Sequence, residues 1–184
     1  MLRQQGIEVH FVDPLRPENF AEAGDERTRA CCANTMPNPK LEVFLIAKVL
    51  EIARERGFPL IIDNTTGPIL ARPFNHGAAF VVHSLTKYIG SHGTSIGGVI
   101  IDCGNFDWTA QLAKQPVLNE PDPSYHSAVW TEAAAPLGPT AFELKARVTL
   151  LRDLGWALSP TNALQIIQVL ETLPIRNREH VKNA

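Results

Sequence analysis

PLIIDNTTGPILARPFNHGAAFVVHSL, residues 59–85, contains two short apolar runs that are each followed by polar residues. The first run, PLII, ends at Asp63, and the second, FVV, leads into Ser84, Thr86 and Lys87. Runs that are apolar throughout over this length are typical of strands buried on both faces of a parallel sheet. The stretch therefore predicts two buried strands with polar residues at their carboxyl ends.

The same alternation continues on both sides of this stretch. Short strand-like runs are separated by longer helix-like segments, which favours an α/β domain with a mainly parallel sheet flanked by helices. Residues 103–139 are rich in proline and aromatic residues, and we expect them to be mostly loop. The predicted strands are IEVHFVD (7–13), RACCAN (29–34), PLIIDN (59–64), AFVVHSL (79–85) and GGVIID (97–102).

Three helices carry boundary signals in the sequence. The signals are an N-cap residue with proline at the first helical position, a capping box, and a glycine that ends a helix. They occur at Asn38–Pro39 with Gly57 as the helix end, at Thr140 with Glu143, and at Ser159–Pro160.

The composition is that of a globular protein. The chain has 184 residues, of which 45% are hydrophobic and 20% charged, so it can bury a core. Its net charge of -2, without a block of like charges, gives no reason to expect nucleic acid or an anionic membrane as partner, so the expected partner is a small molecule. Without a membrane-length apolar run or a signal-peptide pattern, the expected compartment is the cytoplasm.

Cysteine and histidine do not suggest a metal centre. Cys31, Cys32 and Cys103 are odd in number and form no CxxC pair, so they predict neither a disulfide framework nor a zinc site. We expect them to be buried free thiols. His83 and His92 have a spacing that suits no metal, and hydrogen-bonding or packing roles are expected for both.

Asp63 and Lys87 are the candidates for chemistry, since ligands bind open α/β sheets at the carboxyl ends of the strands. A carboxylate directly after four apolar residues should be partly buried and should need a cation or a strong donor. The simpler role for Asp63 is to cap a helix or form a turn. Lys87 is either a solvated strand-edge lysine or a desolvated amine that can form a Schiff base with an aldehyde.

Pyridoxal phosphate would explain these groups together. A lysine links to its aldehyde, an aspartate keeps its ring nitrogen protonated, and hydroxyls bind its phosphate. Strand alternation would bring the hydroxyls of Ser84 and Thr86 near the Lys87 amine. The glycines of residues 90–98 do not form a nucleotide-binding loop, because a strand-like run rather than a helix follows them.

Three segments resemble the Cys/Met-metabolism family of pyridoxal-phosphate enzymes. VVHSLTKYIGSHGTSIGGVIID (81–102) resembles the family's lysine signature, and DNTTGPILARPFNHGA (63–78) resembles the stretch before it. FDW (106–108) with NEPDPSYH (119–126) resembles an insertion of the O-acetylhomoserine sulfhydrylase branch. The resemblance covers essentially the whole chain.

The resemblance assigns roles to individual residues. It implies that Lys87 is the Schiff-base lysine, that Asp63 meets the pyridine nitrogen, and that Ser84 and Thr86 bind the phosphate. Asn38 would lie near the phenolic oxygen of the ring.

Three departures from the family pattern accompany these assignments. Asn34 stands where the family has glutamate, and DNTTGPIL is one residue shorter than its family counterpart. Ser91 replaces a glycine, which matters if that position needs a positive φ.

The resemblance also implies a fold and its extent. We expect the large domain of fold-type I pyridoxal-phosphate enzymes, incomplete at both ends. Residues 1–139 would form the core of the cofactor domain, and residues 140–184 would be helices leading toward an absent C-terminal domain.

The implied activity is γ-replacement on O-acetylhomoserine by sulfide or a thiol, which gives homocysteine or methionine. The full-length family implies a homo-oligomer. The family's phosphate loop would precede Met1, and its substrate-carboxylate arginine would follow Ala184, so the isolated chain is expected to be inactive. The alternative is a truncated, catalytically silent domain or a partner in a hetero-oligomer.

Overall fold

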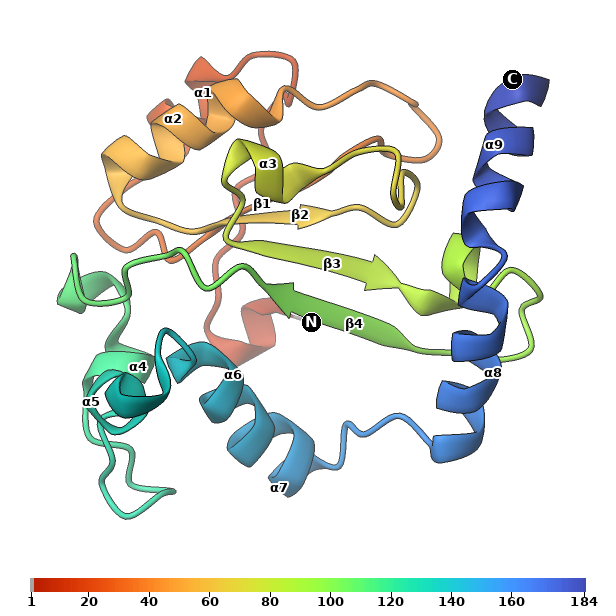
Figure 1. Cartoon of the computed structure of the whole chain (residues 1–184). Helices are drawn as coiled ribbons and strands as arrows, with labels where there is room; N and C mark the ends of the chain where they lie inside the picture. Colours follow the sequence, from red (N-terminus) through yellow and green to blue (C-terminus); the bar gives the residue numbers. More distant parts are fainter. Residues whose placement is uncertain (1) are drawn as a thin grey trace.

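A single four-stranded sheet organises the structure, a computed structural model that describes residues 2–184 (Figure 1). The strands lie in sequence order, with the first three parallel and the fourth antiparallel to the third. The α/β fold with a mainly parallel sheet is thus confirmed. The strands are β1 (Cys31–Asn34), β2 (Leu60–Asp63), β3 (Phe80–Ser84) and β4 (Gly98–Asp102).

The strand expected at residues 7–13 is wrong. The segment has no strand structure, and Phe11 is 95% exposed. Within the described part of the chain, the backbone groups of residues 8–12 make no hydrogen bond to another backbone group. An apolar run becomes a strand only where a neighbouring strand pairs its N–H and C=O groups, and the residues described here supply no such neighbour.

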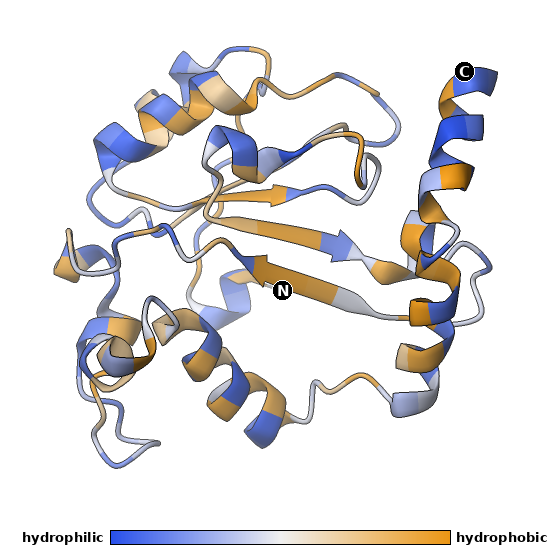
Figure 2. Cartoon of the chain, viewed as in Figure 1, coloured by the Kyte–Doolittle hydropathy of each residue, from blue (hydrophilic) through white to orange (hydrophobic). Residues whose placement is uncertain are grey.

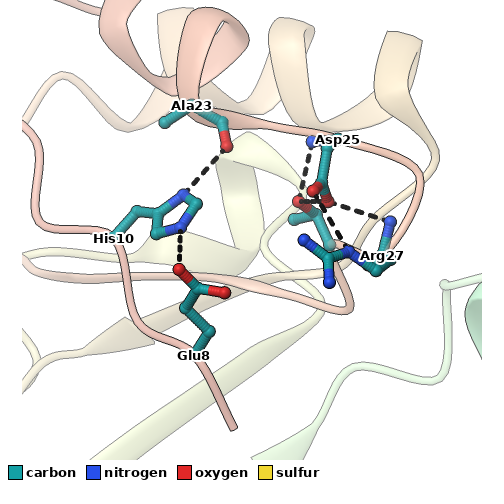
Figure 3. A network of polar contacts seen from close by, with 6 residues as sticks. Glu8, His10, Ala23, Asp25 and Arg27 are labelled. Atoms are coloured by element: carbon teal, nitrogen blue, oxygen red, sulfur yellow. Dashed lines mark hydrogen bonds and ion pairs between the residues drawn. The ribbon is translucent and has the colours of Figure 1, made fainter.

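Side-chain contacts of His10 hold this segment against α1 (Glu18–Ala23) instead (Figure 3). The His10 Nδ1 lies 3.3 Å from the Ala23 carbonyl oxygen, and its Nε2 lies 3.1 Å from a Glu8 carboxylate oxygen. The hydrogen bond to Glu8, followed by that to Ala23, raises the pKa of His10. The contact is exposed, with 52% of the His10 side chain and 64% of the Glu8 side chain accessible to solvent.

One face of the sheet is covered by α2 (Ile46–Arg56), together with α1 and α3 (Pro73–His76) (Figure 1). The buried residues of α2 follow the three- and four-residue spacing of one helical face, and they are Ile46, Val49, Leu50 and Ala53. The helix ends, as expected, at Gly57, whose φ of 69° lets its N–H reach back to the Ala53 and Arg54 carbonyls.

The start expected for this helix at Asn38 and Pro39 is wrong. Both residues lie in a turn, and α2 begins only at Ile46. Leu41 has a φ of 59°, a left-handed backbone that no residue inside a right-handed helix adopts. The proline therefore belongs to the loop before the helix.

The opposite face carries an aromatic cluster. The Phe80 ring lies 4.3 Å from that of Phe142, and the rings of Trp108 and Phe142 stack at 5.9 Å between centroids. Residues 103–139 supply much of this cover through short helical turns rather than loop alone. The elements within this stretch are η3 (Leu112–Lys114), α4 (Pro116–Asn119), α5 (Trp130–Ala134) and η4 (Ala135–Leu137). They are followed by α6 (Ala141–Lys145), η5 (Ala146–Leu151) and α7 (Arg152–Leu154).

Asp122 fixes the loop within this region. Its carboxylate accepts hydrogen bonds from the indole Nε1 of Trp130 at 2.8 Å, from Ser124, and from the Lys145 ammonium. These donors, Lys145 first, hold the pKa of Asp122 far below its usual range. Only 6% of the Asp122 side chain is exposed, so the loop is attached to α6 by a buried charge pair.

Two helices at the end of the chain stand beside the carboxyl tips of the parallel strands (Figure 1). Ser159 caps the first by accepting a hydrogen bond from the Asn162 N–H at 3.2 Å, which confirms that N-cap. Thr140 precedes α6 as expected, yet its hydroxyl is buried without a hydrogen-bond partner, so the capping box is wrong. The elements are α8 (Pro160–Leu170) and α9 (Leu173–Asn183), with a further short turn, η1 (Leu2–Gln5), near the start of the chain.

Hydropathy along the sheet marks where polar chemistry can occur. The strands are hydrophobic over most of their length, whereas β3 becomes hydrophilic at its carboxyl tip (Figure 2). None of the helices within residues 2–184 combines the length and the apolar character needed to cross a membrane. The division of the chain at residue 139 stays a prediction.

Candidate active site

Two strand ends place polar side chains side by side. Asp63 is the last residue of β2 and pairs in register with Asn34 of β1 and Val82 of β3. Ser84, two residues beyond Val82, ends β3 and lies on the same sheet face as Asp63 because strand side chains alternate. The site predicted at the carboxyl edge thus begins with Asp63 and Ser84.

Asp63 is half-buried and does form the turn that was its simpler predicted role. One carboxylate oxygen accepts the Thr65 N–H at 2.9 Å. Among residues 2–184 no ion pair of Asp63 is found, and its second carboxylate oxygen has no protein donor. The cation expected for Asp63 is therefore not supplied by the described side chains, and one oxygen is open to an outside donor.

A buried polar network lies beneath this edge. Asn64, 2% exposed, accepts from the Thr35 hydroxyl at 2.8 Å and donates to the Ala71 carbonyl at 3.1 Å. Thr65 is also buried, and its hydroxyl accepts the Ser84 N–H at 2.8 Å. The network joins the tips of all three parallel strands. Sequence reasoning did not find Thr35 or Thr65, although the polar residues directly after each apolar run were a usable signal.

Lys87 follows β3 in a short helical turn, η2 (Leu85–Ile89). Its backbone breaks the helical conformation, with φ of -94° and ψ of -120°. The residue is exposed, and in the described part of the chain its ammonium makes no hydrogen bond or ion pair. An amine held three residues past the strand tip and without a protein partner is available to react with an aldehyde.

Thr86 departs from the expected strand alternation. The chain turns helical at Leu85, so Thr86 and Lys87 no longer continue the pleat of β3. The Thr86 hydroxyl accepts the Gly97 N–H at 3.1 Å and therefore attaches η2 to the approach of β4. The Leu85 N–H donates to the Gly97 carbonyl at 2.9 Å and strengthens this attachment.

The role of Asn38 beside the other candidates stays a prediction. Asn38 is exposed in the turn after β1, and within residues 2–184 it makes no hydrogen bond to Asp63, Ser84 or Lys87. The loops after β1 and β2 are nevertheless joined, because the Thr66 hydroxyl donates to the Met36 carbonyl at 2.7 Å.

The thiols differ from expectation in burial. Cys31 is buried, and desolvation raises its pKa to about 12, but Cys32 and Cys103 are exposed. Cys32 faces away from α2 because neighbouring strand residues alternate between faces. It pairs in register with Ile61, two residues before Asp63, and its pKa is raised by desolvation and by the charge of Asp63.

His83 adds an unpaired group beside the candidate site. Its Nδ1 is buried and has no hydrogen-bond partner among residues 2–184, and desolvation lowers the pKa of its imidazole. The described residues contain no cluster of three or more metal-ligating side chains.

The chemistry of this edge fits pyridoxal phosphate. Lys87 offers an unpartnered amine for the aldehyde, Asp63 a free oxygen for a protonated ring nitrogen, and Ser84 a half-buried hydroxyl for the phosphate. A parallel sheet that presents a carboxylate, a hydroxyl and a lysine at its carboxyl edge has the groups expected in the cofactor domain of the pyridoxal-phosphate enzyme class.

Comparison with known proteins gives the family. The sequence model described as "Cys/Met metabolism PLP-dependent enzyme" matches residues 1–184, and the chain belongs to this family. It is 53% identical over 185 residues to an O-acetyl-L-homoserine sulfhydrylase of Leptospira meyeri, covering 97% of this chain and 41% of that protein. It is 42% identical to a homocysteine synthase of Schizosaccharomyces pombe, covering 100% of this chain and 42% of that protein.

A solved structure supports the fold. The crystal structure of an O-acetylhomoserine (thiol)-lyase from Campylobacter jejuni superposes with a TM-score of 0.92 at 34% identity, over 100% of this chain and 44% of that chain. That structure carries a pyridoxyl-lysine phosphate group. The chain described here thus spans about two fifths of the length of the relatives it matches.

Proposed function

We propose that this chain is the cofactor-bearing part of an O-acetylhomoserine sulfhydrylase. The whole enzyme would replace the acetoxy group on Cγ of O-acetylhomoserine, which leaves as acetate, with sulfide or a thiol and give homocysteine or methionine. The carrying observation is the arrangement of Asp63 and Lys87 at one sheet edge in a chain whose relatives bear sulfhydrylase and homocysteine-synthase names. The substrates are accordingly small molecules, and the whole enzyme is a homo-oligomer.

Five residues would hold the cofactor in this proposal. Lys87 supplies the amine for the aldehyde, Asp63 accepts from the ring nitrogen, and Ser84 binds the phosphate. Thr86 would have to exchange its contact with Gly97 to join Ser84, and Asn38 would approach the ring's phenolic oxygen from the loop after β1. The bound cofactor supplies an electron sink for carbanion chemistry.

The residues of this chain would supply part of what the reaction needs besides the cofactor. The amine of Lys87 takes and returns protons at the substrate carbons, which needs a base held within hydrogen-bond reach. Asp63 would accept a hydrogen bond from a protonated ring nitrogen, and the Thr65 N–H fixes one of its two oxygens in place. The buried Asn64 network keeps the strand tips at a fixed separation while this occurs.

A second candidate function rests on exposed apolar surface. Ile100 on β4 and Leu164 and Ile167 on α8 are 58–60% exposed, which is typical of a surface that another polypeptide covers. In that candidate the chain is a catalytically silent cofactor-domain part that works only beside a partner. Purified chain with turnover of its own would contradict it.

The test is covalent labelling with the cofactor. Pyridoxal phosphate followed by borohydride should attach a pyridoxyl group to Lys87, and peptide mapping should find the label there. Lys87→Ala should abolish that label, whereas Lys48→Ala, at an exposed position of α2, should leave it unchanged. Label spread evenly over the surface lysines would contradict the proposed role of Lys87.

A further inference from the structure

The turn that carries Lys87 is completed by a residue far away in the sequence. Two of its carbonyls are paired locally, since the Gly90 N–H donates to Leu85 and the Ser91 N–H to Lys87, both at 2.7 Å. The carbonyls of Tyr88 and Ile89 have no such local donor among the described backbone groups. Terminal carbonyls of a helical turn need partners from elsewhere.

Arg176 of α9 provides those partners. Its Nη1 donates to the Tyr88 carbonyl at 2.6 Å, and its Nη2 donates to the Ile89 carbonyl at 3.1 Å. The same Nη2 donates to the Val169 carbonyl of α8 at 3.2 Å, and Nε donates to the Thr172 hydroxyl at 3.1 Å. The planar guanidinium, with five donors in fixed directions, thus joins η2 to the junction of α8 and α9.

Apolar packing supports the same junction. Ile89 is 7% exposed and packs in one cluster with Ile166 of α8 and Leu173 of α9. Asn177, the next residue after Arg176, is 2% exposed and donates to the Pro68 carbonyl at 2.6 Å. Both the loop after Asp63 and the turn after β3 therefore rest on α9.

We propose that Arg176 is a positioning residue for Lys87. By holding the Tyr88 and Ile89 carbonyls, Arg176 fixes the non-helical backbone from which the Lys87 amine projects. The inference rests on the proposed role of Lys87 in binding the cofactor. Without the guanidinium, η2 samples other conformations, and only the fraction of molecules in the original conformation can bind the cofactor. The apparent affinity for the cofactor therefore falls in proportion to that fraction.

Four versions of the 184-residue chain test this inference: wild type, Arg176→Gln, Arg176→Lys and Arg178→Gln. Arg178 lies on the same helix with 72% of its side chain exposed, so it is a matched control. The first measurement is hydrogen exchange of peptides covering residues 88–92, without cofactor, against a peptide covering β2. The second is the borohydride-trapped pyridoxyl label on Lys87 at a subsaturating concentration of pyridoxal phosphate.

For Arg176→Gln, exchange at residues 88–92 should become about tenfold faster while β2 is unchanged, and the Lys87 label should fall about tenfold, since charge-assisted hydrogen bonds are lost. Arg176→Lys keeps the charge but lacks the fork, so both changes should be intermediate. Arg178→Gln should match the wild type.

Two results would overturn the inference. One is wild-type exchange and labelling in Arg176→Gln, and the other is faster exchange spread equally over β2, which indicates a general loss of stability. If Arg176→Gln does not fold, the same comparison with Arg176→Lys decides. A wild-type chain without label on Lys87 counts against the proposed function, while the exchange measurement still decides whether Arg176 orders the turn.

Discussion

The segment near the start of the chain and the last helix are both attached by side chains, in opposite surroundings. His10 contacts α1 at an exposed position, whereas Asn177 reaches the loop after Asp63 from a site that is 2% exposed. A broken exposed contact is replaced by water, but a broken buried contact leaves a polar group without a partner. We call such side-chain contacts anchors. Buried anchors should therefore determine the stability of the fold and the geometry of the candidate site, and exposed anchors should affect neither.

Asp122 is the strongest test of the buried anchors. Asp122→Ala removes the acceptor of the Trp130 indole and leaves the Lys145 ammonium, only 17% exposed, without its partner. Urea unfolding should show the largest loss of stability in this series. Asp107→Ala is the matched control, because Asp107 forms the same kind of turn with Thr109 in an exposed place.

The pH dependence of this pair has a definite sign. The pKa of Asp122 is lowered in the folded state, so its stabilisation is complete above the unfolded pKa of about 3.9 and shrinks as the pH falls below that value. The difference in unfolding free energy between wild type and Asp122→Ala should be constant near neutral pH and should become smaller only in acid. A difference that becomes smaller near neutral pH would contradict this assignment.

Asn177→Ala should have the second-largest effect. The substitution leaves the Pro68 carbonyl without its donor in a buried place, so the free energy of unfolding should fall by about 1–3 kcal/mol. Asn183→Ala, exposed at the end of the same helix, should change it by less than about 0.5 kcal/mol. Equal unfolding midpoints for the two variants would remove the distinction between buried and exposed anchors.

Ser91→Gly should raise stability. Ser91 has a φ of 62°, the left-handed conformation in which a departure from glycine matters, and it lies two residues after the end of η2, the turn that Arg176 holds. Glycine should relieve the strain and raise the unfolding free energy by about 0.5–1 kcal/mol, measured by thermal unfolding. Ser91→Ala keeps the strain and should show no gain; a gain of equal size there would indicate another cause.

His10→Gln should have the smallest effect. The raised pKa of His10 makes its contribution complete below the unfolded pKa of about 6.5 and lost as the pH rises through the folded value. Its exposed position keeps that contribution small. Wild type and variant should differ slightly in melting temperature below the unfolded pKa of about 6.5, and the difference should shrink as the pH rises above it. A larger difference at the higher pH would contradict the assignment.

The sequence predicts those parts of the fold that depend on local pattern. The apolar runs that became β1 to β4 each have a neighbouring strand, whereas IEVHFVD has an equally good pattern but no partner strand in the part of the chain that the structure describes. Gly57 and Ser159 act through contacts within four residues, so both helix boundaries were predictable. Pro39 was misleading because Leu41, two residues later, has a left-handed backbone.

The candidate site divides in the same way. The positions of Asp63, Ser84 and Lys87 at the sheet edge were predictable because each stands at or just after the end of an apolar run, while their roles toward the cofactor stay predictions. The contact of Arg176 was not predictable from the sequence. It donates to backbone carbonyls, which every residue type has, so the acceptor residues carry no recognisable pattern. Its partners can be recognised only once the fold brings them together.

The contact between Arg176 and Tyr88 spans 88 residues of chain, and that between Asn177 and Pro68 spans 109. During synthesis, the turn around Lys87 therefore leaves the ribosome well before the residues that hold it. At about 5–20 residues per second, the turn waits roughly 4–18 seconds for α9. The sheet can form in that interval, but the segment carrying the reactive lysine gains its last carbonyl partners only when translation has passed residue 176.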